Sequence, residues 1–116
     1  MDVAIAQLKY ILANPDDRLA RAVYADILEE SGNIEIAKLW RWFSKVRHTK
    51  CYWPYGIKLK FNGWGWSKKN FPPLLRKHML EQHWKDHVVY KTQKEADIVV
   101  VQLVMAVECK IKAGLA

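Results

Sequence analysis

The sequence predicts an α+β fold in which helices precede and follow a small sheet. Apolar residues recur at helical spacing through residues 1–48, and a short stretch with period-two alternation follows them. A capping-box pattern at residues 92–95 then opens a long apolar run, which predicts a final helix. The 116 residues are expected to form one domain, with a helical part over residues 1–48 and a basic, aromatic-rich α/β part over residues 49–116.

The first two helices are expected over residues 2–13 and 17–30. Asp2 is a suitable cap for the first, and Asn14-Pro15 ends it. Ser31-Gly32 stops the second, so that the two form an αα-hairpin. Apolar residues mark one face of the first helix (Ile5, Leu8, Ile11 and Leu12) and two neighbouring ridges of the second (Leu19, Val23 and Ile27; Ala20, Tyr24 and Leu28).

A third helix is expected over residues 34–48. Its apolar side carries Ile36, Leu39, Trp40, Phe43 and Val46, and we expect Trp40 and Phe43 to lie in the core. Its opposite side carries a basic stripe of Lys38, Arg41, Lys45 and His48. The stripe is therefore expected to form one exposed helix face.

A two- or three-stranded sheet is expected over residues of about 56–66 and 87–91. Apolar residues alternate with lysines over residues 57–61, which is typical of a half-buried strand. Asn62-Gly63 follows directly, and such a pair favours a two-residue hairpin turn with residues 64–66 as the returning strand.

Two further helices are expected after the first part of the sheet. Pro72-Pro73 opens one of about residues 73–85, because proline suits the first helical turn. The run from Ile98 to Val107 is apolar apart from Gln102, and together with the capping box it predicts a buried C-terminal helix over about residues 93–113.

Charge and aromatic residues are concentrated in the middle of the chain. Residues 38–94 contain fourteen Lys or Arg against only Glu81 and Asp86, whereas residues 1–37 carry a net charge of −4. All six tryptophans and twelve of the fourteen aromatic residues also lie in residues 38–94. Basic and aromatic side chains in this arrangement are typical of surfaces that bind phosphates and bases or that anchor a protein partner.

Residues 8–32 contain the pattern Leu-x-x-Ile-Leu-x-Asn-Pro-Asp-Asp, followed by Arg21, Val23-Tyr24-Ala25-Asp26, Leu28-Glu29-Glu30 and Gly32. This pattern resembles a short bacterial module, the repeat-companion domain, and the resemblance covers residues 3–42. Lys38 departs from it where the family usually has an acid, and Ile27 departs where the family usually has Trp.

In longer members of that family, a strand, a helix and another short strand follow the module. Residues 56–61, 71–84 and 88–90 look like a diverged version of this continuation, which implies a β-α-β unit and makes Asn62-Gly63 the start of a loop rather than a hairpin turn. The family accompanies repeats in larger bacterial proteins and carries no established enzymatic activity. The resemblance therefore implies a small accessory protein, from a mobile element or phage.

No catalytic, cofactor or metal site is expected. Cys51 and Cys109, which we interpret as unbridged thiols, lie outside any nucleophile motif, and no glycine-rich phosphate loop is present. His83 and His87 would lie one turn apart only if the preceding helix continued through them. Three polar residues of the resembling pattern are assigned structural roles, with Tyr24 on the core ridge and Arg21 and Asp26 at its borders, where they pair with neighbouring helices.

The expected function is non-catalytic binding of a partner in the cytoplasm. No run reaches the length of about 18 apolar residues that spans a bilayer. In the first interpretation, a protein-interaction module or inhibitor docks on an acidic protein surface or a nucleoprotein complex. In the second, the same residues bind nucleic acid, with cations on phosphates and rings on unpaired bases. The predicted partner-binding residues are Lys38, Arg41, Lys45, Trp53, Tyr55, Lys58, Lys60, Trp64, Trp66, Lys68 and Lys69.

Overall fold

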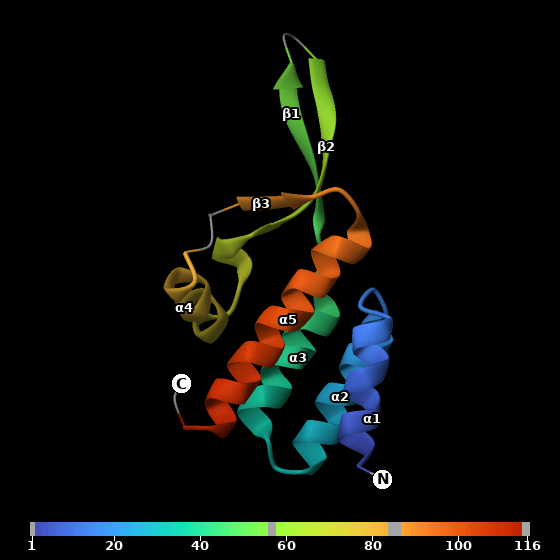
Figure 1. Cartoon of the computed structure of the whole chain (residues 1–116), viewed down its shortest axis with the longest axis vertical. Helices are drawn as coiled ribbons and strands as arrows, with labels where there is room; N and C mark the ends of the chain where they lie inside the picture. Colours follow the sequence, from blue (N-terminus) through green and yellow to red (C-terminus); the bar gives the residue numbers. More distant parts are fainter. Residues whose placement is uncertain (1, 56–57, 84–86, 115–116) are drawn as a thin grey trace.

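Four helices form a body from one end of which a strand pair projects (Figure 1). The computed structural model describes residues 2–55, 58–83 and 87–114, and for residues 52–55, 58–60, 62, 67–68 and 87–88 it describes the backbone alone. The helices of the body are α1 (Val3–Ala13), α2 (Arg18–Glu30), α3 (Ile34–Lys45) and α5 (Gln93–Lys112). Helices in the described chain thus precede and follow a small antiparallel sheet, which confirms the α+β prediction.

The caps of these helices follow the sequence closely. Asp2 accepts a hydrogen bond from the Ala4 amide, Asp17 from the Ala20 amide, and Thr92 from the Glu95 amide. Helix α3 ends at Lys45 because Val46 is extended, three residues before the expected end. His48 therefore leaves the predicted basic stripe and lies in the connector to the sheet.

Only one of the two predicted ridges of α2 is buried. Ala20, Tyr24 and Leu28 lie in the core, whereas the Leu19 side chain is 75% exposed and Val23 is also exposed. On α1, Ile11 is buried and Ile5 and Leu12 are exposed. Both helices thus bury a narrower stripe than their apolar pattern predicts.

The sheet has the order β1-β2-β3 and is antiparallel throughout. Its strands are β1 (Thr49–Tyr55), β2 (Lys58–Ser67) and β3 (His87–Tyr90). The strand that pairs with residues 58–61 precedes them in the chain, so the predicted hairpin with residues 64–66 as its returning strand is wrong. The expected β-α-β unit is also wrong, because β3 runs antiparallel to β2.

Asn62-Gly63 forms a bulge inside β2. Cys51 pairs with Gly63 and Tyr52 pairs with Phe61, which leaves Asn62 as the extra residue. Gly63 has φ +141°, and a Cβ atom there would lie 2.3 Å from the Tyr90 carbonyl oxygen of β3. The Asn-Gly pair therefore allows β2 and β3 to approach closely and does not form a turn.

A short 3₁₀ helix, η1 (Lys68–Asn70), and α4 (Pro73–Glu81) connect β2 to β3. Pro73 occupies the first turn of α4, as predicted, but the helix ends four residues earlier than expected. His83 follows with a positive φ of 58°, so the helix does not continue through His83 and the one-turn arrangement with His87 does not form.

The core is one cluster of buried side chains drawn from every helix named α and from β2. Trp40 and Phe43 are fully buried in it, as predicted, and α5 supplies its largest share with Ala96, Val100, Val101, Leu103, Val104 and Val107. Edge-to-face contacts join Tyr24 to Trp40 at 5.0 Å and Trp66 to Phe71 at 5.9 Å between ring centroids. In the part of the chain that the structure describes, no helix has the length and apolar character needed to cross a bilayer.

Candidate partner-binding site

The outer part of the β1–β2 hairpin projects beyond the helical body, and we call its residues 51–55 and 58–63 the arm (Figure 1). Strand β3 pairs only with residues 64–67 of β2, so the arm has two strands. The molecule measures 55 × 27 × 17 Å, and its radius of gyration of 15.3 Å exceeds the value of about 13 Å for a compact domain of this length. The arm is thus held at one end of an elongated molecule.

The arm belongs to a stretch without carboxylates. Residues 36–80 contain no Asp or Glu and eleven Lys or Arg. In the register of β1 and β2, Trp53 lies opposite Lys60 and Tyr55 lies opposite Lys58, so two cross-strand pairs each combine an aromatic and a basic residue. A positive potential at the arm is the electrostatic consequence.

Trp64 lies at the centre of an aromatic cluster at the base of the arm. Its ring is 5.0 Å from the His48 ring and 5.7 Å from the Phe61 ring, measured between centroids. Lys50 Nζ lies 5.6 Å from the Trp64 ring, within the range of a cation–π contact. Phe61 remains 47% exposed and Lys50 is exposed, so the cluster presents both an apolar and a cationic group to solvent.

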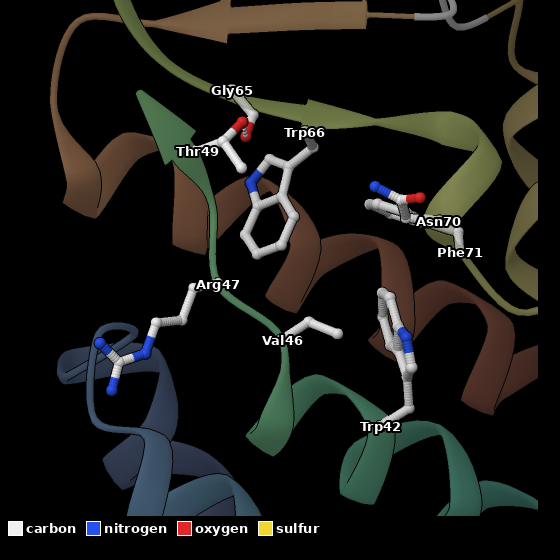
Figure 2. A pocket seen from close by; sticks show the side chains of 8 residues that line it. All are labelled: Trp42, Val46, Arg47, Thr49, Gly65, Trp66, Asn70 and Phe71. Atoms are coloured by element: carbon white, nitrogen blue, oxygen red, sulfur yellow. Dashed lines mark hydrogen bonds between the residues drawn. The ribbon is translucent and has the colours of Figure 1, made fainter. Parts of the chain in front are cut away.

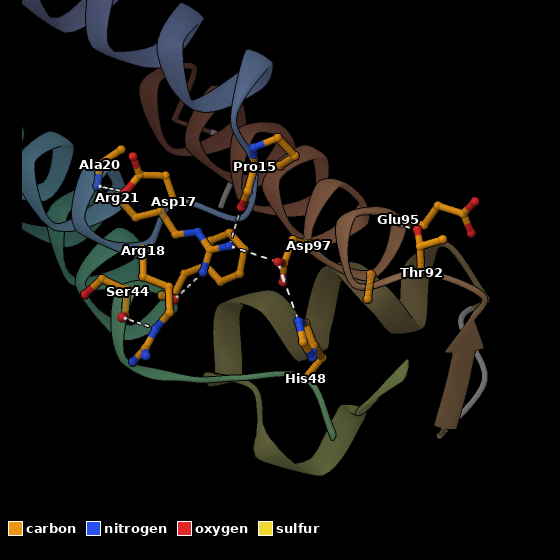
Figure 3. A network of polar contacts seen from close by, with 12 residues as sticks. Pro15, Asp17, Arg18, Ala20, Arg21, Ser44, His48, Thr92, Glu95 and Asp97 are labelled. Atoms are coloured by element: carbon orange, nitrogen blue, oxygen red, sulfur yellow. Dashed lines mark hydrogen bonds and ion pairs between the residues drawn. The ribbon is translucent and has the colours of Figure 1, made fainter. Parts of the chain in front are cut away.

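A buried polar network ties the base of the arm to the body (Figure 3). His48 Nε2 and Arg21 Nη2 each lie 3.6 Å from Asp97 Oδ2. Arg21 also donates hydrogen bonds to the carbonyl oxygens of Pro15 and Phe43. Its guanidinium stacks 3.8 Å above the Phe43 ring. The network joins the connector before β1 to α2 and α5.

Burial dominates the electrostatics of this network. It raises the pKa of Asp97, and the charges of Arg21 and His48 offset only part of that effect. Burial also lowers the pKa of Arg21, against the opposing effect of Asp97. Because each charged group is costly to bury alone, Arg21 and Asp97 depend on each other.

A hollow of about 240 Å³ with aromatic walls lies beside the base of the arm (Figure 2). Trp42 and Phe71 form one wall, with ring centroids 5.0 Å apart, and Trp66 forms another. The other lining residues are Val46, Arg47, Thr49, Gly65 and Asn70. Its size and lining suit one apolar side chain of a partner.

The predicted binding residues fall into three groups. Trp53, Tyr55, Lys58 and Lys60 belong to the arm by their backbone, and Lys68 to η1, but their side chains lie outside the described residues. Trp64 is half-buried at the base of the arm, and Lys69 of η1 is exposed. Lys38 and Lys45 are exposed on α3, where Lys45 adjoins the connector to β1 and Lys38 lies two turns further from it.

One predicted binding residue, Trp66, needs correction, and a second, Arg41, already contacts carboxylates within the chain. Trp66 does not serve as an exposed anchor, because it is only 5% exposed and its Nε1 donates a hydrogen bond of 2.7 Å to the Ala96 carbonyl oxygen. Arg41 is held by Asp26 and Glu29 of α2, and these contacts raise its pKa. The prediction that Asp26 pairs with a neighbouring helix is thereby confirmed, whereas Arg21 is wholly buried rather than at a border.

Sequence reasoning did not single out Arg47, Lys50 or Phe61. All three belong to the basic, aromatic segment. The pairing of β1 with β2 places Lys50 opposite Trp64, and Phe61 contacts Trp64 from within β2. The role of His48 at the base of the arm was also missed, because it was assigned to the stripe on α3.

The described residues bring together neither a metal-ligating cluster nor a disulfide. They contain no group of three or more His, Cys, Asp or Glu that would hold a metal ion, and Cys51 and Cys109 form no disulfide. No family model, curated protein or solved structure matches this chain. The site is therefore interpreted from its own residues.

Proposed function

We propose that the chain is a non-catalytic binding protein whose arm docks on an acidic surface of a protein partner. The observation that carries the proposal is the projection of a two-stranded hairpin from the body within a stretch that has no carboxylates. An isolated two-stranded hairpin is only marginally stable in water, so a partner that covers it supplies packing that the chain itself does not.

In this proposal, charge and apolar groups have separate tasks. Lys50 and the lysines of the arm attract the acidic surface and set the orientation of the encounter. Phe61 and Trp64 supply the apolar contact, and the hollow beside Trp42 receives an apolar side chain of the partner.

The resemblance of residues 3–42 to the repeat-companion domain supports the same class of function. A family without established enzymatic activity fits an accessory protein, or an inhibitor, that acts by occupying a surface of its partner. We place this contact in the cytoplasm, since the two cysteines form no disulfide.

Nucleic acid is the second candidate partner. The absence of carboxylates from residues 36–80 favours it, because phosphate contacts are repelled by acidic side chains. Binding of this kind would be recognised by a steep, linear fall of log affinity with log salt, with a slope of about −0.7 to −0.9 per neutralised phosphate.

Affinity capture from a nuclease-treated lysate of the source cells tests the proposal. The bait is the wild-type chain or one of two double variants. The arm variant, Lys50→Ala/Phe61→Ala, changes a lysine at the base of the arm and a phenylalanine on it. The control variant, Lys77→Ala/Leu80→Ala, changes an exposed lysine and an exposed apolar side chain on α4. We expect one protein to be retained by the wild type and the control and lost from the arm variant.

Two results would contradict the protein-partner proposal. Capture that is unchanged in the arm variant would place the contact elsewhere on the molecule. Capture that is seen only when the nuclease treatment is omitted, together with anisotropy of labelled oligonucleotides that falls steeply between about 50 and 200 mM salt, would establish the nucleic-acid interpretation instead.

A further inference from the structure

A second, polar hollow of about 300 Å³ lies between the start of α2, the connector over residues 46–48 and the start of α5. Asp16 and Arg18 line it from the α2 side, Arg47 and His48 from the connector, and Gln93 from the first turn of α5. Figure 3 shows four of the polar residues that line it, Arg18, Arg21, His48 and Asp97. It shares Val46 and Arg47 with the hollow beside Trp42, and no described residue of the arm lines it.

The guanidinium groups of this hollow differ in how far they are already engaged. Arg21 is committed to Asp97 and to two carbonyl oxygens. Arg18 is anchored at one side, where its Nε and Nη2 each lie 3.1 Å from a carbonyl oxygen at the end of α3, those of Ser44 and Lys45. Arg47 is exposed and pairs with no carboxylate among the described residues. One anchored guanidinium and one exposed guanidinium therefore border the same space.

Hydrogen-bond donors exceed acceptors around the hollow. Asp97 already faces both Arg21 and His48, and Asp16 is the other carboxylate in the lining. Two buried nitrogen atoms, Arg21 Nε and His48 Nδ1, have no hydrogen-bond partner within the described part of the chain. A ligand that fits such a lining brings several acceptor oxygens and negative charge.

The positive end of α5 adds to this bias. Gln93 is the first residue of this 20-residue helix, and the dipole of a helix favours negative charge at its N-terminus. The cavity and its arginines are the main features, and the helix dipole reinforces the same sign of charge.

We propose that this hollow is a binding site for a compact oxyanion of the phosphate class, held between Arg18 and Arg47. Arg18 supplies a fixed charge, because two of its nitrogens are already anchored to α3. Arg47 closes over the ligand from the connector, and the Gln93 amide donates from α5. Neither partner docking nor the identity of a partner enters this assignment, so it stands or falls separately from the proposed function.

Titration with inorganic phosphate at constant ionic strength tests the assignment. Binding is measured by calorimetry and by the shifts of the backbone amide signals of residues 46–48 and 93 in NMR spectra. The variants are Arg47→Gln and, as a control with the same loss of charge at a neighbouring exposed site outside the hollow, Lys45→Gln. We expect saturable binding to the wild type and to Lys45→Gln, with affinity at least about tenfold weaker in Arg47→Gln. Circular dichroism and thermal unfolding of both variants check that they remain folded.

Two sources of the same chemistry are separated by competition. Displacement of phosphate by dimethyl phosphate would identify a phosphodiester of a nucleic-acid backbone as the ligand, and absence of competition would identify a free or terminal phosphate. Failure to see saturable binding, or equal weakening in Arg47→Gln and Lys45→Gln, would overturn the assignment, because either result reduces the effect to the net charge of the protein.

Discussion

Gly63 is required at its position by two separate constraints. Its φ of +141° is a backbone conformation that residues with a side chain rarely adopt. In addition, β3 leaves no space for a Cβ atom, which would also lie 2.8 Å from a methyl carbon of Val89. Both constraints arise from the bulge that brings β3 against β2 at the base of the arm.

We predict that Gly63→Ala lowers the free energy of unfolding by about 2–4 kcal/mol, through backbone strain and overpacking together. Gly32→Ala is the control, because Gly32 also has a positive φ of 86° but has open space around it. The control should lose about 1 kcal/mol. Urea denaturation of both variants measures the difference, and equal losses would show that the contact with β3 does not constrain position 63.

His78 is a titrating group that joins α4 to α5. Lys110 Nζ donates a hydrogen bond of 2.7 Å to His78 Nδ1 and lies equally close to Glu81 Oε2. Burial and the Lys110 charge lower the pKa of His78 below its ordinary value of 6.5, with Glu81 acting in the opposite direction. Protonation of His78 removes the acceptor and places two cations together.

Because the folded-state pKa of His78 is lowered, the unfolded chain takes up the proton first as the pH falls. The stability that neutral His78 contributes is therefore present above pH 6.5 and is lost as the pH falls through the folded-state pKa. We predict that His78→Gln has a smaller fall in melting temperature between pH 7.5 and 5.5 than the wild type, while His83→Asn, at an exposed site, keeps the wild-type fall. Parallel curves for wild type and His78→Gln would contradict this role.

At the level of elements, two buried polar contacts join α2 to α5: the Arg21–Asp97 pair and a hydrogen bond of 2.8 Å from the Tyr24 hydroxyl to Glu108 Oε1. Arg21 is 1% exposed and its carbonyl acceptors come from Pro15 and Phe43, so three segments meet at one guanidinium. Removing one member of a buried pair leaves the other charge without compensation.

We predict that Asp97→Asn lowers the free energy of unfolding by about 3 kcal/mol, since Arg21 remains buried without its counter-charge. Glu29→Gln removes a carboxylate from the exposed contact with Arg41 and should cost much less, because solvent screens that pair. Chemical denaturation of the two variants gives the comparison. A loss in Asp97→Asn no larger than in Glu29→Gln would show that Arg21 is held by its carbonyl acceptors alone.

Local sequence signals predicted the elements well and their pairing poorly. The caps at Asp2 and Thr92 depend on neighbouring backbone groups, so the pattern was sufficient to place these helix starts. Whether Asn62-Gly63 forms a turn or a bulge depends on which strand pairs with it, and that pairing involves residues far from it in the sequence. The local sequence pattern therefore does not indicate this strand pairing.

Local composition also indicated some of the candidate site residues and not others. The segment that forms the arm is rich in aromatic residues and lysines, and the sequence composition shows this directly. Trp66 and Trp64 are two residues apart in the same segment, yet one bonds to Ala96 in the core and the other borders solvent. Which ring is buried depends on α5 packing against β2, and this tertiary contact has no local signature.

At the level of the whole molecule, stability and recognition are assigned to different regions. The core lies in the helical body and at the base of the sheet, whereas the arm lies beyond it. Charge is divided in the same sense, with a net charge of −4 over residues 1–37 and no carboxylate over residues 36–80. In the proposed function, this separation of charge lets the arm attract a partner of opposite charge.

This division predicts different costs for two phenylalanines. Phe71 is buried against Trp42 and Trp66, so Phe71→Ala should lower the free energy of unfolding by about 3–5 kcal/mol. Phe61→Ala should cost less than about 1 kcal/mol, because the ring is half-exposed and packs outside the core. Thermal and urea unfolding measure both, and comparable losses would show that the arm belongs to the cooperative core.

The most direct measurement of the central claim is site-specific photo-crosslinking in nuclease-treated lysate of the source cells. A photoreactive phenylalanine analogue replaces Phe61 on the arm or, as the control, Leu80 on α4, which is also exposed. The proposed function predicts a covalent adduct with one acidic protein from position 61 and none from position 80. No adduct from position 61, or the same set of adducts from both positions, would contradict the assignment of the arm as the partner-binding surface.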